Sequence, residues 1–76
     1  MARVMTPNQE LLTEYFWEIK MRPSMGLLII ATIWDEEATL EMLKYIQKTR
    51  EKNPAKLYET ALEISAKYKV VENLPD

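Results

Sequence analysis

The hydrophobic pattern of the chain has one uninterrupted apolar run, MGLLIIATIW at residues 25–34. With 10 residues it is too short to span a membrane as a helix, which takes about 20. Ser24 can cap a short helix over 25–33, whereas the β-branched residues in the run also suit a buried strand. We favour the helix because no other segment offers a strand partner, so that a lone strand would have to pair across a dimer.

The stretch before the run has the pattern of an amphipathic helix over about 7–21. Thr6 can act as the N-cap, Pro7 suits the first helical position, and Gln9 completes a capping box. Pro23 forces an end just before it, because the residue preceding a proline disfavours helical geometry. The sequence therefore predicts both ends of this helix.

Two further amphipathic helices follow the run, over about 36–51 and 54–69. Asp35 can cap the first of them, and Asn53 followed by Pro54 can end it and start the next. Apolar residues spaced three or four apart mark the faces that we expect in the core. Along the three amphipathic helices they are Leu12, Phe16 and Ile19; Leu40, Leu43 and Ile46; and Leu57, Ala61, Ile64 and Tyr68.

These elements predict an all-α fold, a small compact bundle of about four helices with the short apolar helix at its centre. The 76 residues form a single domain, 1–76, near the lower size limit for independent folding. We expect residues 70–76 to be a loose C-terminal tail, because they contain Pro75 and no periodic pattern.

Composition excludes several classes of site. The sequence has no Cys and no His, which removes disulfides, the usual zinc ligands and the base of a Ser-His-Asp triad. Its single glycine cannot build a phosphate-binding loop. We therefore expect no catalytic residue, no cofactor and no small-molecule substrate, and hence no enzyme. The absence of Cys and of an apolar leader segment favours the cytoplasm.

Acidic residues recur every four positions at Glu10, Glu14 and Glu18, and so share one helix face. Such a row could bind a hard cation, but no Asp-rich loop accompanies it. We interpret the row as a solvated face and expect no metal. Like charges at this spacing repel mildly, which favours a positively charged neighbour.

A basic stretch over 44–56 carries a local charge of +4 from five cations and one Glu. The cations are Lys44, Lys48, Arg50, Lys52 and Lys56. They suit the C-terminal end of a helix, and the acidic row could pair with them within the chain or across a dimer. Contact with nucleic acid is the alternative. Against it stand the net charge of −2 and the exposed Glu59 and Glu63 on the last helix.

Trp17 is the most informative single position. It lies about 100° around the helix from Phe16, outside the apolar stripe, with Met21 one turn further on and Glu14 beside it. Large apolar side chains among charges are typical of binding surfaces. The alternative is that the short apolar helix folds back over Trp17. Trp34, at the end of the apolar run, belongs to the core or to one edge of an interface.

Together the patterns predict a small non-enzymatic protein–protein interaction module. A chain so short has more apolar surface than one core readily covers, so we expect it to self-associate through apolar helix faces, as a dimer, or to bind a protein partner. The expected partner-binding residues are Trp17, Met21, Glu14 and Trp34. The alternative function is a helical DNA-binding regulator that uses the basic stretch 44–56.

Overall fold

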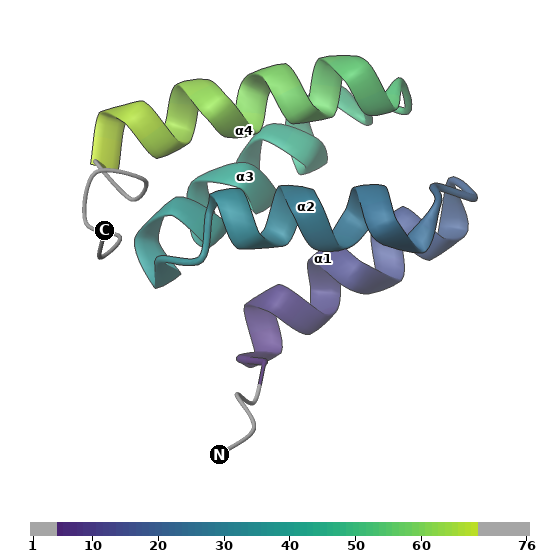
Figure 1. The fold of residues 1–76 in the computed structure, drawn as a ribbon, viewed down its shortest axis with the longest axis horizontal. Coiled ribbons are helices and arrows are strands. Elements are labelled where there is room, and N and C mark those ends of the chain that lie inside the picture. Colours follow the sequence, from purple (N-terminus) through teal and green to yellow (C-terminus); the bar gives the residue numbers. More distant parts are fainter. Residues whose placement is uncertain (1–4, 69–76) are drawn as a thin grey trace.

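The computed structural model describes residues 5–68 and contains four helices (Figure 1). They are α1 (Pro7–Glu18), α2 (Pro23–Thr32), α3 (Glu36–Thr49) and α4 (Pro54–Tyr68). No strand occurs between residues 5 and 68, so the all-α prediction is confirmed and the strand alternative for 25–33 is wrong. The expected tail, 70–76, lies outside the described residues. None of the four helices is long and apolar enough to cross a membrane.

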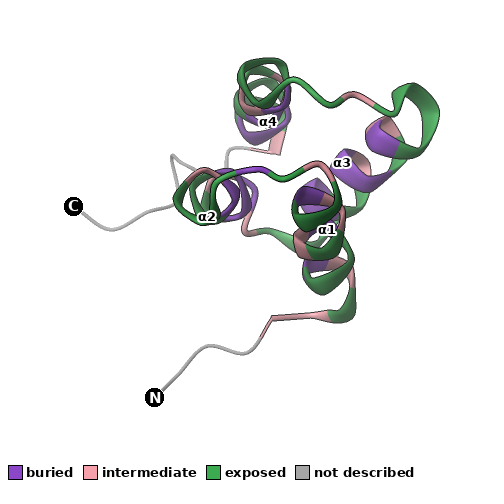
Figure 2. Ribbon diagram, turned by 90° about the vertical axis from the view of Figure 1, so that its right-hand side faces the viewer, coloured by how far each residue is buried: buried purple, intermediate pink, exposed green. Residues whose placement is uncertain are grey.

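The four helices form a ring in which each packs mainly on two others. α1 packs on α2 and α3, and α4 packs on α3 and α2. In Figure 2 the buried faces of the ribbon turn inward and the exposed faces outward. The side chain of Asn8 donates to Glu36 at 3.2 Å, and the hydroxyl of Tyr15 donates to the carbonyl of Glu51. These two bonds join the beginnings and then the ends of α1 and α3, so the two helices run parallel.

The core fills the inside of this ring with apolar side chains from all four helices. Leu12, Ile29, Ile33, Met42 and Leu57 have no exposed surface. Complete burial of a Leu, Ile or Met side chain is worth about 1.5–3 kcal/mol, so these five positions anchor the fold.

The apolar helix α2 does not lie at the centre of the bundle, where it was expected. Like each of the other helices, it packs mainly on two neighbours, α1 and α4. Gly26, Ile29 and Ile30 face inward, whereas Leu27 and Leu28 are 59% and 46% exposed. Four helices of 10 to 15 residues can close a ring, but three cannot surround a fourth on all sides. One side of a wholly apolar helix therefore faces solvent.

The buried stripe of α3 contains the predicted Leu43 and Ile46 but not the predicted Leu40. Leu40 was expected in the core but is 42% exposed, whereas Thr39 is fully buried beside Met42 and Leu43. The hydroxyl of Thr39 donates to the carbonyl of Ile33 at 2.8 Å. That bond makes the burial of a polar residue acceptable and ties α3 to the end of α2.

The predicted helix starts are confirmed except for that of α2. Thr6 and Gln9 form the capping box of α1, and the Asp35 carboxylate accepts two backbone N–H groups at the start of α3. α2 begins at Pro23 with no side-chain cap bond, so Ser24 lies inside the helix instead of capping it. A proline needs no cap for its own position, because it has no N–H to satisfy.

α1 ends at Glu18, three residues earlier than predicted. Lys20 adopts the left-handed conformation with φ 59°. Its N–H donates to the carbonyl of Trp17 at 3.0 Å, and the N–H of Met21 donates to that of Phe16 at 2.9 Å. This pair of bonds is a Schellman motif. It reverses the chain soon enough for α2 to start at Pro23.

Candidate interaction surface

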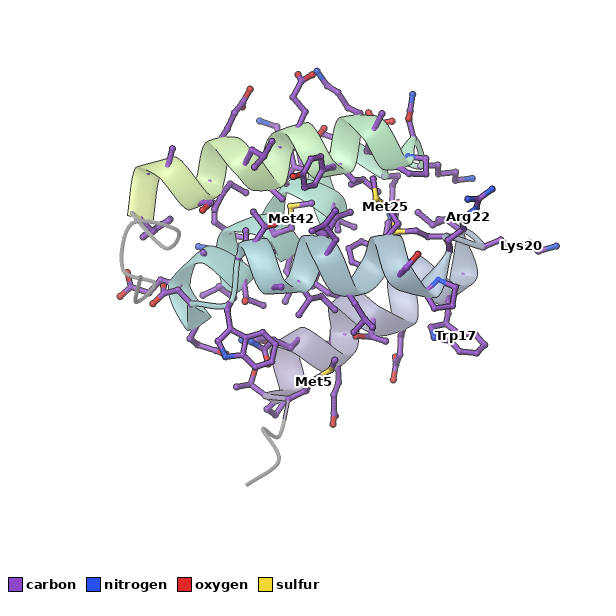
Figure 3. All side chains as sticks on the ribbon, viewed as in Figure 1. Met5, Trp17, Lys20, Arg22, Met25 and Met42 are labelled. Atoms are coloured by element: carbon purple, nitrogen blue, oxygen red, sulfur yellow. The ribbon has the colours of Figure 1, made fainter. Side chains whose placement is uncertain are left out.

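Trp17 stands at the end of the bundle where α1 turns into α2. It is 74% exposed, the highest value among the large apolar side chains of residues 5–68. Figure 3 shows it pointing away from the bundle, on the same end of the molecule as Lys20 and Arg22. α2 does not fold back over it, so the expectation of an accessible Trp17 is confirmed and the alternative of a covered one is wrong.

Met21 is not exposed beside Trp17, contrary to the prediction, although both side chains line the groove between α1 and α2. Only 8% of Met21 is exposed, because the early end of α1 carries it out of the helix and into the core. Its sulfur and the ring of Phe16 both lie against the backbone of Gly26, at 3.9 and 3.4 Å from the point where a Cβ would stand. A Cβ at this position would make ordinary van der Waals contacts with both side chains.

Two grooves flank the outer side of α2. The α1–α2 groove has a volume of about 200 Å³ and lies between Trp17 and Leu27, with Gly26 and Ile30 among its other lining residues. The α2–α4 groove has a volume of about 720 Å³. Its lining includes Lys20, Met21, Arg22, Met25, Leu28 and Pro54. Since Leu27 lines one groove and Leu28 the other, the two leucines form an apolar ridge between them.

Charged side chains of both signs surround this surface. Glu14 lies one turn before Trp17 on α1 and Glu18 directly after it, and both are exposed. Lys20 and Arg22 are also exposed and line the α2–α4 groove. The ion pairs within residues 5–68 are Lys56–Glu59 and Lys67–Glu41. None of the four charges around Trp17 therefore takes part in an ion pair of the described chain.

Trp34 is not part of this surface. It is half-buried and packs against the core, and its carbonyl accepts a hydrogen bond from the Gln9 side chain at 3.3 Å. Gln9 and Trp17 are eight residues apart on α1, a rise of about 12 Å. The structure thus brings Trp17 and Glu14 together and places Trp34 near the other end of α1.

The basic stretch forms a separate surface around the connection from α3 to α4. All five cations are exposed. Lys44 and Lys48 lie one turn apart on α3, whereas Lys52 lies in the connection because α3 ends at Thr49. Among residues 5–68 no ion pair joins these cations to the acidic row of α1, so the predicted pairing within the chain is wrong.

A polar cavity of about 390 Å³ lies between α3 and α4 and includes Glu41 and Lys67 in its lining. The hydroxyl of Tyr68 donates to the Glu41 carboxylate at 2.8 Å, and Lys67 donates at 3.1 Å. The hydrogen bond from Tyr68 is the main cause that lowers the pKa of Glu41, and the bond from Lys67 lowers it further. The same hydrogen bond to Glu41 raises the pKa of Tyr68. Each group keeps the other in its resting protonation state, which suits a structural contact rather than proton transfer.

Residues 5–68 contain no cluster of three or more acidic side chains that could hold a metal ion.

The sequence did not predict the two grooves or the part that Leu27, Leu28, Met25, Lys20 and Arg22 take in lining them. Spacing could not have found them, because α2 is apolar both on the side of Ile29 and Ile30 and on the side of Leu27 and Leu28.

Comparison with known protein families, with curated proteins and with solved structures finds no match for this chain. The proposals below therefore depend on its own residues.

Proposed function

We propose that this chain is a small non-enzymatic protein–protein interaction module that self-associates through the end of the bundle carrying Trp17. The observation that carries the proposal is the exposure of Trp17, 74%, beside a ridge of two exposed leucines. Tryptophan is enriched among the residues that dominate binding energy at interfaces. A contiguous exposed apolar patch on a small protein is typical of a binding site.

The free energy gained by burying Trp17 indicates how much apolar surface a dimer interface has to cover. Covering the exposed part of Trp17 is worth roughly 3–5 kcal/mol, from 150–250 Å² per Trp at 25 cal/mol/Å². Two copies give about 6–10 kcal/mol, which is of the same size as the association cost of about 4–15 kcal/mol. Trp17 alone therefore does not hold a stable pair, and Leu27 and Leu28 have to be covered as well. We expect a dimer with a dissociation constant in the micromolar range.

A second copy of the chain is the partner that the surface suits best. Apolar side chains, grooves and charges of both signs occur together at one end of the molecule. When one surface carries both a projecting side chain and a groove that can receive it, two copies can pair through that surface about a two-fold axis. This is the commonest symmetry of soluble oligomers.

The test compares the self-association constants of the parent chain, Trp17→Ala and Leu62→Ala by sedimentation equilibrium. Leu62 is the matched control, because it is 43% exposed on α4 and lines neither groove. We expect Trp17→Ala to weaken association at least tenfold and Leu62→Ala to leave it unchanged. Equal association of all three chains would remove Trp17 from the interface and contradict the proposal.

The alternative function is DNA binding by the basic stretch, and the exposure of all five cations favours it. It predicts binding to duplex DNA that weakens steeply with added salt. Changing Lys44, Lys48 and Lys52 to Gln should weaken that binding. Changing Lys67 of α4, which is paired with Glu41 of α3, to Gln should not. An absence of binding at low salt would eliminate this function.

A further inference from the structure

We infer that the α2–α4 groove receives Trp17 of a second copy, held there by pairing of Glu14 and Glu18 with Lys20 and Arg22 across a two-fold axis. This rests on the proposed self-association and specifies its geometry: which part of one copy enters which part of the other. Three properties of the surface support it, namely the size of the groove, its lining and the order of charges around it.

The α2–α4 groove has the size and lining that an indole requires. Its volume of about 720 Å³ lies within the 300–1,000 Å³ typical of ligand pockets. The α1–α2 groove has about 200 Å³ and is bounded by the chain's own Trp17. Met21 and Met25 line the larger groove, and methionine adapts its shape to an aromatic ring and attracts it through sulfur.

The two carboxylates next to Trp17 on α1 are opposite in sign to the two cations that line the α2–α4 groove. Glu14 and Glu18 lie beside Trp17 on one face of α1, whereas the α2–α4 groove is lined by Lys20 and Arg22 and by no acidic residue. Arg22 also lines the α1–α2 groove together with Trp17. When Trp17 enters the groove of the other copy, carboxylates therefore meet cations. A two-fold axis makes the same contact twice, because the groove of the first copy then receives the Trp17 of the second.

An acidic helix of another protein is a less complete occupant. It would match Lys20 and Arg22 but would leave Trp17 exposed and would face the carboxylates of Glu14 and Glu18. An anionic lipid surface meets the same repulsion. An occupant with an apolar side chain next to acidic groups, and with a groove of its own for Trp17, satisfies both contacts, and a second copy of this chain is such an occupant.

The test reverses each set of charges in turn, at positions that are exposed, so that the helical fold is kept. The first variant, Glu14→Lys with Glu18→Lys, has cations around Trp17 and around the groove. The second, Lys20→Glu with Arg22→Glu, has carboxylates at both. Each variant should dimerise at least tenfold more weakly than the parent, because like charges meet. Circular dichroism checks that both remain helical.

Mixing the two variants is the decisive step, because each then offers the other opposite charges at both contacts. We expect an equimolar mixture to form a heterodimer about as strongly as the parent forms its homodimer. Reversing Glu59 and Glu63 to Lys on α4 is the control, and it should leave the homodimer unchanged.

The outcomes distinguish this inference from the proposal beneath it. If the parent dimerises but the reversed variants dimerise equally well, or if their mixture stays monomeric, the pairing of Trp17 with the groove is wrong and self-association stands. If the parent is monomeric at all concentrations, the proposed function fails as well. Binding of an acidic helical peptide or an anionic vesicle that competes with an intact dimer for Lys20 and Arg22 would also overturn the pairing.

Discussion

The Thr39 hydroxyl sits fully buried where α2 passes into α3 and donates to the carbonyl of Ile33. Thr39→Val keeps the shape of the side chain but leaves that carbonyl without its donor. We expect it to lower the free energy of unfolding by about 1–3 kcal/mol, the cost of a buried unsatisfied polar group. Urea denaturation measures the change.

Thr32→Val is the control for this substitution, because the Thr32 hydroxyl bonds a carbonyl of its own helix in an exposed position. It should change stability by no more than about 0.5 kcal/mol. A loss equal to that of Thr39→Val would show that the buried hydrogen bond has no special weight.

Ser65 presents the opposite case. It is 1% exposed, and its hydroxyl has no hydrogen-bond partner. Ser65→Ala removes an unsatisfied polar group and introduces the best helix former, so we expect α4 and the whole chain to be stabilised by about 0.5–1 kcal/mol. The denaturation midpoint should rise; a fall would mean that the hydroxyl has a partner in solution.

At single positions the sequence predicts burial only in part. It predicts Leu12, Phe16, Leu57 and Ile64 correctly, because their spacing matches one helix face. It fails at Leu40 and Thr39, because hydropathy ranks a leucine above a threonine for the core. The direction in which α3 meets its neighbours decides instead, and Thr39 is accepted there once its hydroxyl finds a carbonyl.

At the scale of the element, helix starts are predictable and helix ends are less so. Thr6, Asp35 and Asn53 cap as expected, because the chemistry of a cap is local. The ends of α1 and α3 fall two or three residues early. Their left-handed positions are held by Lys20 and Arg50, where glycine would be the recognisable signal.

These two residues give a matched test of stability against function. The left-handed conformation costs a residue with a Cβ roughly 1–2 kcal/mol, a cost that glycine avoids. Glycine in turn costs about 0.5–1 kcal/mol in backbone entropy. Lys20→Gly and Arg50→Gly should therefore each stabilise the fold by about 0.5–1 kcal/mol. Thermal unfolding measures both.

Only the first of the two should impair association. Lys20 lines the α2–α4 groove, whereas Arg50 lies at the end of α3, away from it. We expect Lys20→Gly to be more stable and to dimerise more weakly, and Arg50→Gly to be more stable and to dimerise like the parent. If both variants dimerise equally strongly, Lys20 is not part of the dimer interface.

At the scale of the whole molecule, the sequence predicts the number, order and class of the helices but not the side of α2 that faces inward. A helix apolar on all sides carries almost no directional signal, so tertiary packing decides which half is buried. Packing places Ile29 and Ile30 inside and leaves Leu27 and Leu28 outside. Leu27 and Leu28 are therefore exposed near Trp17, whereas the other exposed leucines of residues 5–68, Leu11, Leu40 and Leu62, line neither groove.

Sedimentation equilibrium of the unmodified chain, from micromolar to millimolar concentration at physiological salt, tests the proposed self-association most directly. The chain mass is 9.0 kDa. The surface around Trp17 predicts an apparent mass that rises with concentration toward twice this value, the closed two-fold pair. A mass that stays at that of one chain over the whole range would contradict the account.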